Sequence, residues 1–165
     1  MPFQLRPDAI LTEVKAFNDK LAQGMTNLME LGEISSGVTP YEVVYREDKL
    51  QLLHYLGEEP PRNKIPTLIV YALVNRPYMT DLQEDRSTIK GLLDAGQDVY
   101  LIDWGYPDAS DRYLNLDDYI NGYIDNCVEA IRARHGIEQI NLLGICQGGA
   151  FSLCYTATHA DKIKN

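Results

Sequence analysis

Cysteine and histidine are both scarce in this chain, which has three of each among its 165 residues. The cysteines, Cys127, Cys146 and Cys154, are odd in number and irregularly spaced, which argues against a disulfide framework and favours a reducing, cytoplasmic compartment. No two of them form a C-x-x-C pair. We therefore expect no zinc site, no other metal and no cofactor.

The chain also lacks an excess of positive charge and long apolar runs. The formal net charge is −9, which argues against nucleic acid or an anionic membrane as the main partner. No apolar run approaches the ~20 residues of a membrane span, and the N-terminus lacks the layout of a signal peptide. At 45% hydrophobic residues, the chain has enough apolar side chains for the core of one domain.

An amphipathic pattern opens the chain. Between residues 8 and 32, apolar side chains recur in steps of three and four, at Ile10, Val14, Phe17, Leu21, Met25 and Leu28. This spacing predicts a helix that begins near Pro7 and ends at Gly32. The apolar stripe packs on its own domain or docks on a partner or an apolar surface. We assign residues 1–34 to this helix and its connector, and residues 35–165 to a catalytic domain.

Strand and helix patterns alternate through the remainder. Segments 41–46 and 51–56 predict a hairpin. Continuous apolar runs at 67–73, 98–104 and 139–143 predict buried parallel strands, separated by helices at 87–95 and 116–134 and followed by a helix at 147–160. This order predicts a doubly wound α/β fold with a mostly parallel sheet and the hairpin at its edge.

The third apolar run leads into the sequence Gly144-Ile-Cys146-Gln-Gly148-Gly149. A nucleophile between glycines, after a strand and before a helix, is the pattern of a nucleophile elbow, with Cys146 as the nucleophile. We expect side chains at Gly144 and Gly148 to collide with neighbouring backbone, and we count Gly149 with them as an elbow glycine. The helix N-terminus favours a thiolate. Cys127 and Cys154 are expected in the core.

An acyl-transfer site also needs N–H groups that stabilise an oxyanion. One should be the backbone N–H of Gln147, and the other should come from the loop after the first core strand, at Val74 or Asn75. In the same loop, we expect Arg76 to be an exposed surface residue, with binding of an anion as the alternative.

No histidine is placed to act as the base. His54 lies in the edge hairpin, and His135 ends the helix before the elbow strand, at the opposite edge of the sheet from the nucleophile. His159 follows Cys146 on the same helix, roughly 20 Å away at ~1.5 Å per residue. In this architecture the acid and the histidine follow later strands. We therefore expect the N-terminal part of a longer enzyme, with the fold truncated after the elbow helix.

These residues resemble a known family. The box from Gly144 to Gly149 is similar to the lipase-like box of polyhydroxyalkanoate (PHA) synthases, and segments 71–82 and 98–105 resemble their strand-end segments. The short N-terminal extension and the Asp-Trp-Gly stretch at Asp103 look most like the catalytic C subunit of the two-subunit, class III type. The resemblance runs from about residue 35 to the end and is most specific between 67 and 154.

The resemblance implies an α/β-hydrolase-like acyltransferase that polymerises (R)-3-hydroxyacyl-CoA, typically 3-hydroxybutyryl-CoA, and releases CoA. Cys146 matches the acyl-carrying cysteine, and Val74 and Gln147 match the positions whose backbone amides hold the oxyanion. The family's aspartate and histidine have no matching positions here. The implied partners are a second, E-type synthase subunit and the surface of cytoplasmic polymer granules.

Two other functions stay open at this point. A cysteine hydrolase of the same fold, such as a thioesterase or a dienelactone-hydrolase-like enzyme, has the same elbow; release of free hydroxy acid from the thioester would distinguish it. A non-catalytic binding fragment fits the missing base and the apolar stripe of the first helix. Capture by a partner subunit without acylation of Cys146 would favour that alternative.

Overall fold

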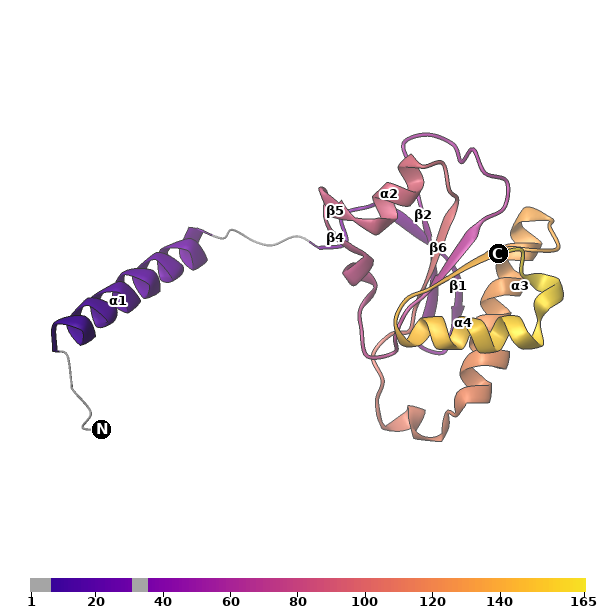
Figure 1. Ribbon diagram of the computed structural model, residues 1–165. Helices are drawn as coiled ribbons and strands as arrows, with labels where there is room; N and C mark the ends of the chain where they lie inside the picture. Colours follow the sequence, from indigo (N-terminus) through magenta and orange to yellow (C-terminus); the bar gives the residue numbers. More distant parts are fainter. Residues whose placement is uncertain (1–6, 31–35) are drawn as a thin grey trace. The chain divides into compact units, whose positions relative to one another are not determined.

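The computed structural model describes residues 7–30 and 36–165, and the chain divides into two compact units, residues 1–34 and 35–165 (Figure 1). The first unit contains the helix α1, Pro7–Glu30. The second contains two sheets and the remaining helices.

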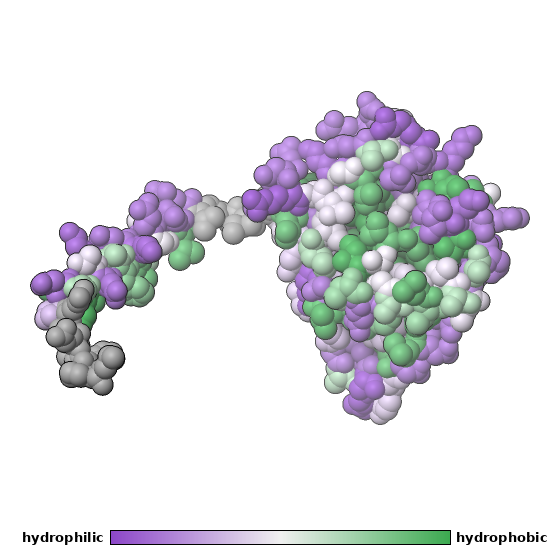
Figure 2. Space-filling view, viewed as in Figure 1, coloured by the Kyte–Doolittle hydropathy of each residue, from purple (hydrophilic) through white to green (hydrophobic). Residues whose placement is uncertain are grey.

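Helix α1 confirms the amphipathic helix expected from the sequence. It begins at Pro7, where the missing N–H of proline costs no helical hydrogen bond. All its residues are exposed, and hydrophobic residues gather along one of its sides (Figure 2). The stop expected at Gly32 lies outside the described residues. Among the helices that the structure describes, none is long and apolar enough to cross a membrane.

The larger sheet has five strands in the order β1-β2-β6-β3-β7. Their bounds are β1 Tyr41–Glu47, β2 Leu50–Tyr55, β6 Val99–Asp103, β3 Thr67–Val70 and β7 Asn141–Gly144. The hairpin β1–β2 pairs antiparallel, and β2 continues antiparallel onto β6. Strand β3 lies parallel to both β6 and β7. The predicted edge hairpin and parallel centre are confirmed.

The connections run in opposite directions from β3. The chain passes through α2 (Thr88–Asp94) to β6 on one side of β3, then through α3 (Asp125–His135) to β7 on the other side. The remaining elements are η1 Pro77–Thr80, β4 Asp81–Gln83, β5 Arg86–Ser87, α2 Thr88–Asp94, η2 Ala109–Tyr113, η3 Asp118–Ile124, α3 Asp125–His135, α4 Gln147–Thr158 and η4 Ala160–Lys162. In such a doubly wound sheet, ligands bind beyond the carboxyl ends of the strands, where the order reverses. That point lies beside β3 and β7.

Helix α4 crosses α3 in Figure 1, and Tyr155 of α4 donates a hydrogen bond of 2.6 Å to Asp125 at the start of α3. Behind them the core is formed by side chains that are fully buried, among them Leu68, Ile69, Tyr100, Leu101, Ile124 and Ile131. All four residues of β3 are buried, as predicted for a strand covered on both faces. Strand β7 is less buried, because its outer edge pairs only with the last residues of the chain, where Ile140 bridges Ile163.

The segment 116–134, which we predicted as one helix, is not a regular α-helix throughout. Its first part, η3, is a π-helix, and regular α-helix begins at Asp125 and ends where Gly136 adopts a left-handed conformation. The π-helical turn holds Tyr119 between two rings: it stacks on Phe151 of α4 and meets Trp104 edge-on. By contrast, the helix predicted at 87–95 is confirmed, with the Ser87 side chain accepting the N–H of Lys90 as its cap.

Candidate active site

The turn between β7 and α4 has the backbone of a nucleophile elbow. Cys146 has φ 57° and ψ −125°, a conformation that side-chain-bearing residues rarely adopt and that costs on the order of 1–3 kcal/mol. The turn is held to the centre of the sheet by the N–H of Ile145, which donates to the carbonyl oxygen of Val70 at 2.8 Å. Cys146 is exposed at the N-terminus of α4. The thiol is thus presented at the carboxyl end of the sheet.

Two of the three elbow glycines are required by space. A Cβ atom at Gly148 would lie 2.1 Å from the carbonyl oxygen of Val70, and one at Gly144 would lie 2.5 Å from the Cα atom of Gly149. These contacts are with backbone, which cannot move aside cheaply. At Gly149 itself the nearest atom to an added Cβ is 3.6 Å away, an ordinary contact. The prediction holds for Gly144 and Gly148, and no steric requirement applies at Gly149.

The backbone N–H groups of Val74 and Gln147 have no acceptor among the described residues. The other candidate, Asn75, donates its N–H to the carbonyl oxygen of Ala72 at 3.0 Å, closing a turn. Of the two residues that the sequence left open for the loop, Val74 is thus the one whose N–H has no acceptor among the described residues. Free N–H groups on two elements that meet at the elbow are what an oxyanion hole requires.

The loop that carries Val74 is held by the side chains of Gln147 and Trp104 and by its own Arg76. The Leu73 N–H donates to Oε1 of Gln147 at 3.2 Å, and the indole N–H of Trp104 donates to the buried carbonyl oxygen of Tyr71 at 2.9 Å. Arg76 donates to the carbonyl oxygen of Gly105 at 3.0 Å. None of these bonds was expected from the sequence, because side-chain partners across a fold leave no local pattern in the chain.

Arg76 is not the exposed arginine that we expected. It is half-buried, and its guanidinium carbon lies 3.0 Å from the centre of the Tyr106 ring. That stacking and the bond to Gly105 give Arg76 a role within the protein, in which it links the loop after β3 to the loop after β6.

The other two cysteines have opposite environments. Cys127 is buried in the core, as predicted, and burial raises the pKa of its thiol strongly. The prediction for Cys154 was wrong, because its side chain is exposed. It lies beside Leu153 on α4, which is 74% exposed, and in Figure 2 hydrophobic residues gather over the area where Figure 1 places α4. This side of the helix faces away from the sheet.

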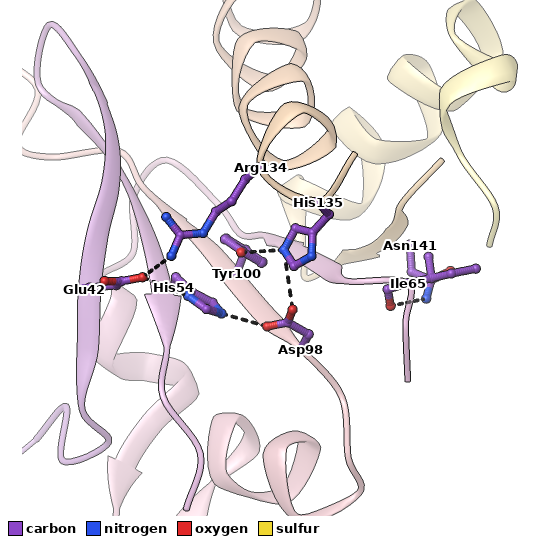
Figure 3. A network of polar contacts seen from close by, with 8 residues as sticks. All are labelled: Glu42, His54, Ile65, Asp98, Tyr100, Arg134, His135 and Asn141. Carbon is purple, nitrogen blue, oxygen red and sulfur yellow. Dashed lines mark hydrogen bonds and ion pairs between the residues drawn. The ribbon is translucent and has the colours of Figure 1, made fainter. Parts of the chain in front are cut away.

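The histidines lie away from the elbow. His54 and His135 form a polar network with Asp98 at the amino end of β6, the end opposite to the one that carries Cys146 (Figure 3). His54 Nε2 lies 2.7 Å from Asp98 Oδ1, and His135 Nε2 lies 2.7 Å from the hydroxyl of Tyr100. The expectation that both are far from the nucleophile is confirmed.

His159 ends α4 and stacks on the ring of Tyr155, with the ring centroids 4.4 Å apart. Its Nδ1 faces the hydroxyl of Thr158 at 2.8 Å. The elbow therefore has a nucleophile and candidate oxyanion donors, but none of the chain's three histidines supplies a base there. Within residues 7–30 and 36–165, no group of three or more histidine, cysteine or carboxylate side chains is arranged to hold a metal ion.

Two family models match the chain. One, described as the N-terminus of poly-beta-hydroxybutyrate polymerase (PhaC), matches residues 8–92, and one described as the alpha/beta hydrolase fold matches residues 68–165. Among solved structures, the chain is similar to a putative lipase from Sulfolobus solfataricus, with a TM-score of 0.53 and 19% identity over 75% of this chain and 47% of the lipase. Epoxide hydrolase A from Mycobacterium thermoresistibile gives 0.52 and 18% over 76% of this chain and 37% of that one. At these identities the likeness shows the fold alone.

Curated relatives extend the match to nearly the whole chain. The poly(3-hydroxyalkanoate) polymerase subunit PhaC of Allochromatium vinosum is 61% identical over 99% of this chain and 47% of its own length. The subunit of the same name from Synechocystis is 52% identical over 100% of this chain and 45% of its own length, and that of Cupriavidus necator is 32% identical over 87% and 27%. The chain thus spans about half the length of the first two relatives. It belongs to the poly-beta-hydroxybutyrate polymerase (PhaC) family and has the α/β-hydrolase fold.

Proposed function

We propose that this chain carries the nucleophile half of a poly(3-hydroxyalkanoate) polymerase site, in which Cys146 holds the growing acyl chain as a thioester. The observation that carries the proposal is the elbow. An exposed cysteine with φ 57° follows the glycine that ends β7 and precedes a helix whose Gly148 has no room for a side chain. Relatives of this chain are named polymerase subunits, which supports acyl transfer as the chemistry.

The proposed first step is an exchange of thioesters. The Cys146 thiolate attacks the carbonyl carbon of (R)-3-hydroxyacyl-CoA, for which we take 3-hydroxybutyryl-CoA as the representative substrate. The carbonyl oxygen becomes an oxyanion, and collapse of this intermediate breaks the bond to the CoA sulfur and releases CoA. Because one thioester replaces another, the bound acyl group stays reactive towards the hydroxyl of an incoming monomer or chain.

The oxyanion would be held by the N–H groups of Val74 and Gln147. Both lack an acceptor among the described residues, so both are available when charge develops on the substrate oxygen. Removing one such donor typically costs about 10²–10³ in rate. The N-terminus of α4 adds a favourable dipole for the thiolate at Cys146.

We place the base and its supporting acid, a histidine and an aspartate, in a part of the polymerase other than the segment described here. None of the three histidines is near the elbow, and the chain spans about half the length of its relatives. The histidine would activate the thiol and later the attacking hydroxyl. We further propose a second, E-type subunit as partner, the polymer granule surface as location, and the cytoplasm as compartment.

Acylation of Cys146 by 3-hydroxybutyryl-CoA is the test. At alkaline pH, where the thiolate forms without a base, peptide mass spectrometry should find one hydroxybutyryl group on Cys146 of the wild-type chain and none on Cys146→Ala, which has no nucleophile. Cys146→Ser should acylate far more slowly, because a hydroxyl is a weaker nucleophile and gives a more stable oxygen ester.

Cys154→Ala is the matched control, since Cys154 is an exposed cysteine of the same helix. It should acylate at the wild-type rate. Equal acylation of the wild type and Cys146→Ala would overturn the proposal. With the residues that supply the base present, insoluble polyester and CoA support the polymerase, whereas free hydroxy acid indicates a hydrolase. Binding of a partner subunit with no acylation indicates a non-catalytic fragment.

A further inference from the structure

The Gln147 side chain joins the two elements that carry the candidate oxyanion donors. Its own backbone N–H is one donor, and its amide oxygen Oε1 accepts the N–H of Leu73, the residue before Val74, at 3.2 Å. Because the group facing Oε1 is a backbone N–H, the atom that faces it has to be the oxygen of the amide. One residue thus supplies a donor and bonds the loop that supplies the other.

Few other contacts fix the position of Val74. Its side chain is 88% exposed, so packing does not fix the position of its N–H. The base of the loop is fixed, since Val70 and Tyr71 pack against Gly148 with no room for a Cβ, and the Trp104 indole bonds the carbonyl oxygen of Tyr71. Further along the loop Arg76 bonds Gly105, and between these two points the hydrogen bonds of the two neighbours of Val74 remain.

Those two bonds differ in what they connect. The bond from Asn75 to Ala72 closes a turn within the loop, so it shapes the loop without tying it to the elbow. The bond from Leu73 to Gln147 runs to α4 and therefore sets the distance between the two N–H groups. An oxyanion hole works only when both donors reach the same oxygen, so this distance matters for catalysis.

We infer that the Gln147 side chain is a positioning residue of the oxyanion hole, which holds the Val74 N–H at the spacing that the tetrahedral intermediate requires. The inference rests on the proposed function, because it presumes that Cys146 is acylated. It assigns to the side chain a task separate from that of its backbone N–H, which any residue except proline would retain.

Two variants test the hydrogen bond to Leu73 independently of the rest of the Gln147 side chain. Gln147→Met has nearly the same length but lacks the acceptor oxygen, whereas Gln147→Glu keeps an acceptor for the Leu73 N–H. Gln83→Met makes the same change at an exposed glutamine of β4 and serves as the control. A Cys154→Ala background leaves Cys146 as the exposed thiol of the full chain.

The first measurement is amide hydrogen exchange at Leu73. Gln147→Met should exchange roughly tenfold faster there, as expected for the loss of a hydrogen bond worth on the order of 1 kcal/mol. Gln147→Glu and Gln83→Met should stay near the wild-type rate. Unchanged exchange at Leu73 in Gln147→Met overturns the inference, because the bond would then not hold the loop.

The second measurement is the ratio of two rates at Cys146, acylation by 3-hydroxybutyryl-CoA and alkylation by iodoacetamide, at alkaline pH where thiolate forms without a base. Acylation develops an oxyanion and alkylation does not, so a merely structural change leaves the ratio unaltered. We expect Gln147→Met to lower the ratio roughly tenfold, a fraction of the effect of losing a donor altogether.

Gln147→Glu should also lower the ratio of acylation to alkylation, since its carboxylate opposes the developing oxyanion. The Leu73 N–H should stay protected from hydrogen exchange in this variant. An unchanged ratio in Gln147→Met, despite faster exchange at Leu73, overturns the positioning role. A wild-type chain that is alkylated but never acylated overturns the proposed function and the positioning role with it, an outcome visible before any variant is compared.

Discussion

At the amino ends of β3 and β6 the polar groups bond one another, whereas at the carboxyl ends several are left free. His54, Asp98 and His135 form a closed network with Tyr100, and Asp98 is only 6% exposed (Figure 3). At the other end, two N–H groups lack acceptors among the described residues, and Cys146 has an unfavourable φ. Satisfied polar groups stabilise a fold, while unsatisfied groups and strain are the usual marks of a site that acts on a ligand.

The largest expected effect comes from the carboxyl end, where the close approach of Gly148 to β3 can be broken directly. Gly148→Ala would place a methyl group 2.1 Å from the carbonyl oxygen of Val70, and we expect a loss of about 3 kcal/mol or more in the free energy of unfolding. Urea unfolding followed by circular dichroism measures it.

Gly149→Ala is the neighbouring control. Its added Cβ has no contact closer than 3.6 Å, and alanine suits a helix better than glycine, so stability should be unchanged or higher by about 0.5–1 kcal/mol. Similar losses in both variants would show that the elbow is not constrained by the approach of Gly148 to β3.

A second prediction concerns the amino end. Asp98→Ala removes the hydrogen-bond partner of His54 Nε2 and the carboxylate that lies 3.5 Å from His135 Nε2, so we expect a loss of about 2–3 kcal/mol in the free energy of unfolding. Urea unfolding measures this loss too. In the folded variant, alkylation of Cys146 by iodoacetamide should keep its wild-type rate. A changed rate would contradict the separation between the two ends.

The smallest expected effect is a dependence of stability on pH. Burial alone would lower the pKa of His54, but its contacts with Asp98 and Glu42 outweigh burial and the neighbouring Arg134, and the pKa is raised above its ordinary value. The stabilisation that protonated His54 provides is therefore complete below the pKa of His54 in the unfolded chain, ~6.5. It is lost as pH rises through the higher pKa of His54 in the folded protein.

Unfolding midpoints in urea at about pH 6 and pH 9 test this. The wild type should lose more stability between them than His54→Gln, whose amide does not titrate but can still donate to Asp98. His135, Tyr100 and Glu42 are present in both proteins, so the difference between the two losses reports on His54. Equal losses would mean that His54 is not held as an imidazolium.

The sequence predicted the features that depend on local pattern. The apolar run of β3 follows from burial on both faces, and the helix α1 follows from apolar side chains in steps of three and four. Cys154 was assigned wrongly, because helical spacing does not say which side of α4 meets the sheet. The π-helix η3, which precedes α3, was also missed, since Tyr119 is held there by contacts with Trp104 and Phe151.

The features of the elbow divide in the same way, into those predicted from the sequence and those set by the tertiary structure. The sequence alone determined that Cys146 stands between glycines in a strand-to-helix turn, because the spacing of the glycines is a local requirement of that backbone. The tertiary structure decided the rest. It bonded the N–H of Asn75 to Ala72, showed that Gly149 is not required by space, and brought the Gln147 side chain to Leu73. Those outcomes depend on distances between β3 and α4, elements far apart in the chain, and these distances exist only once the sheet has formed.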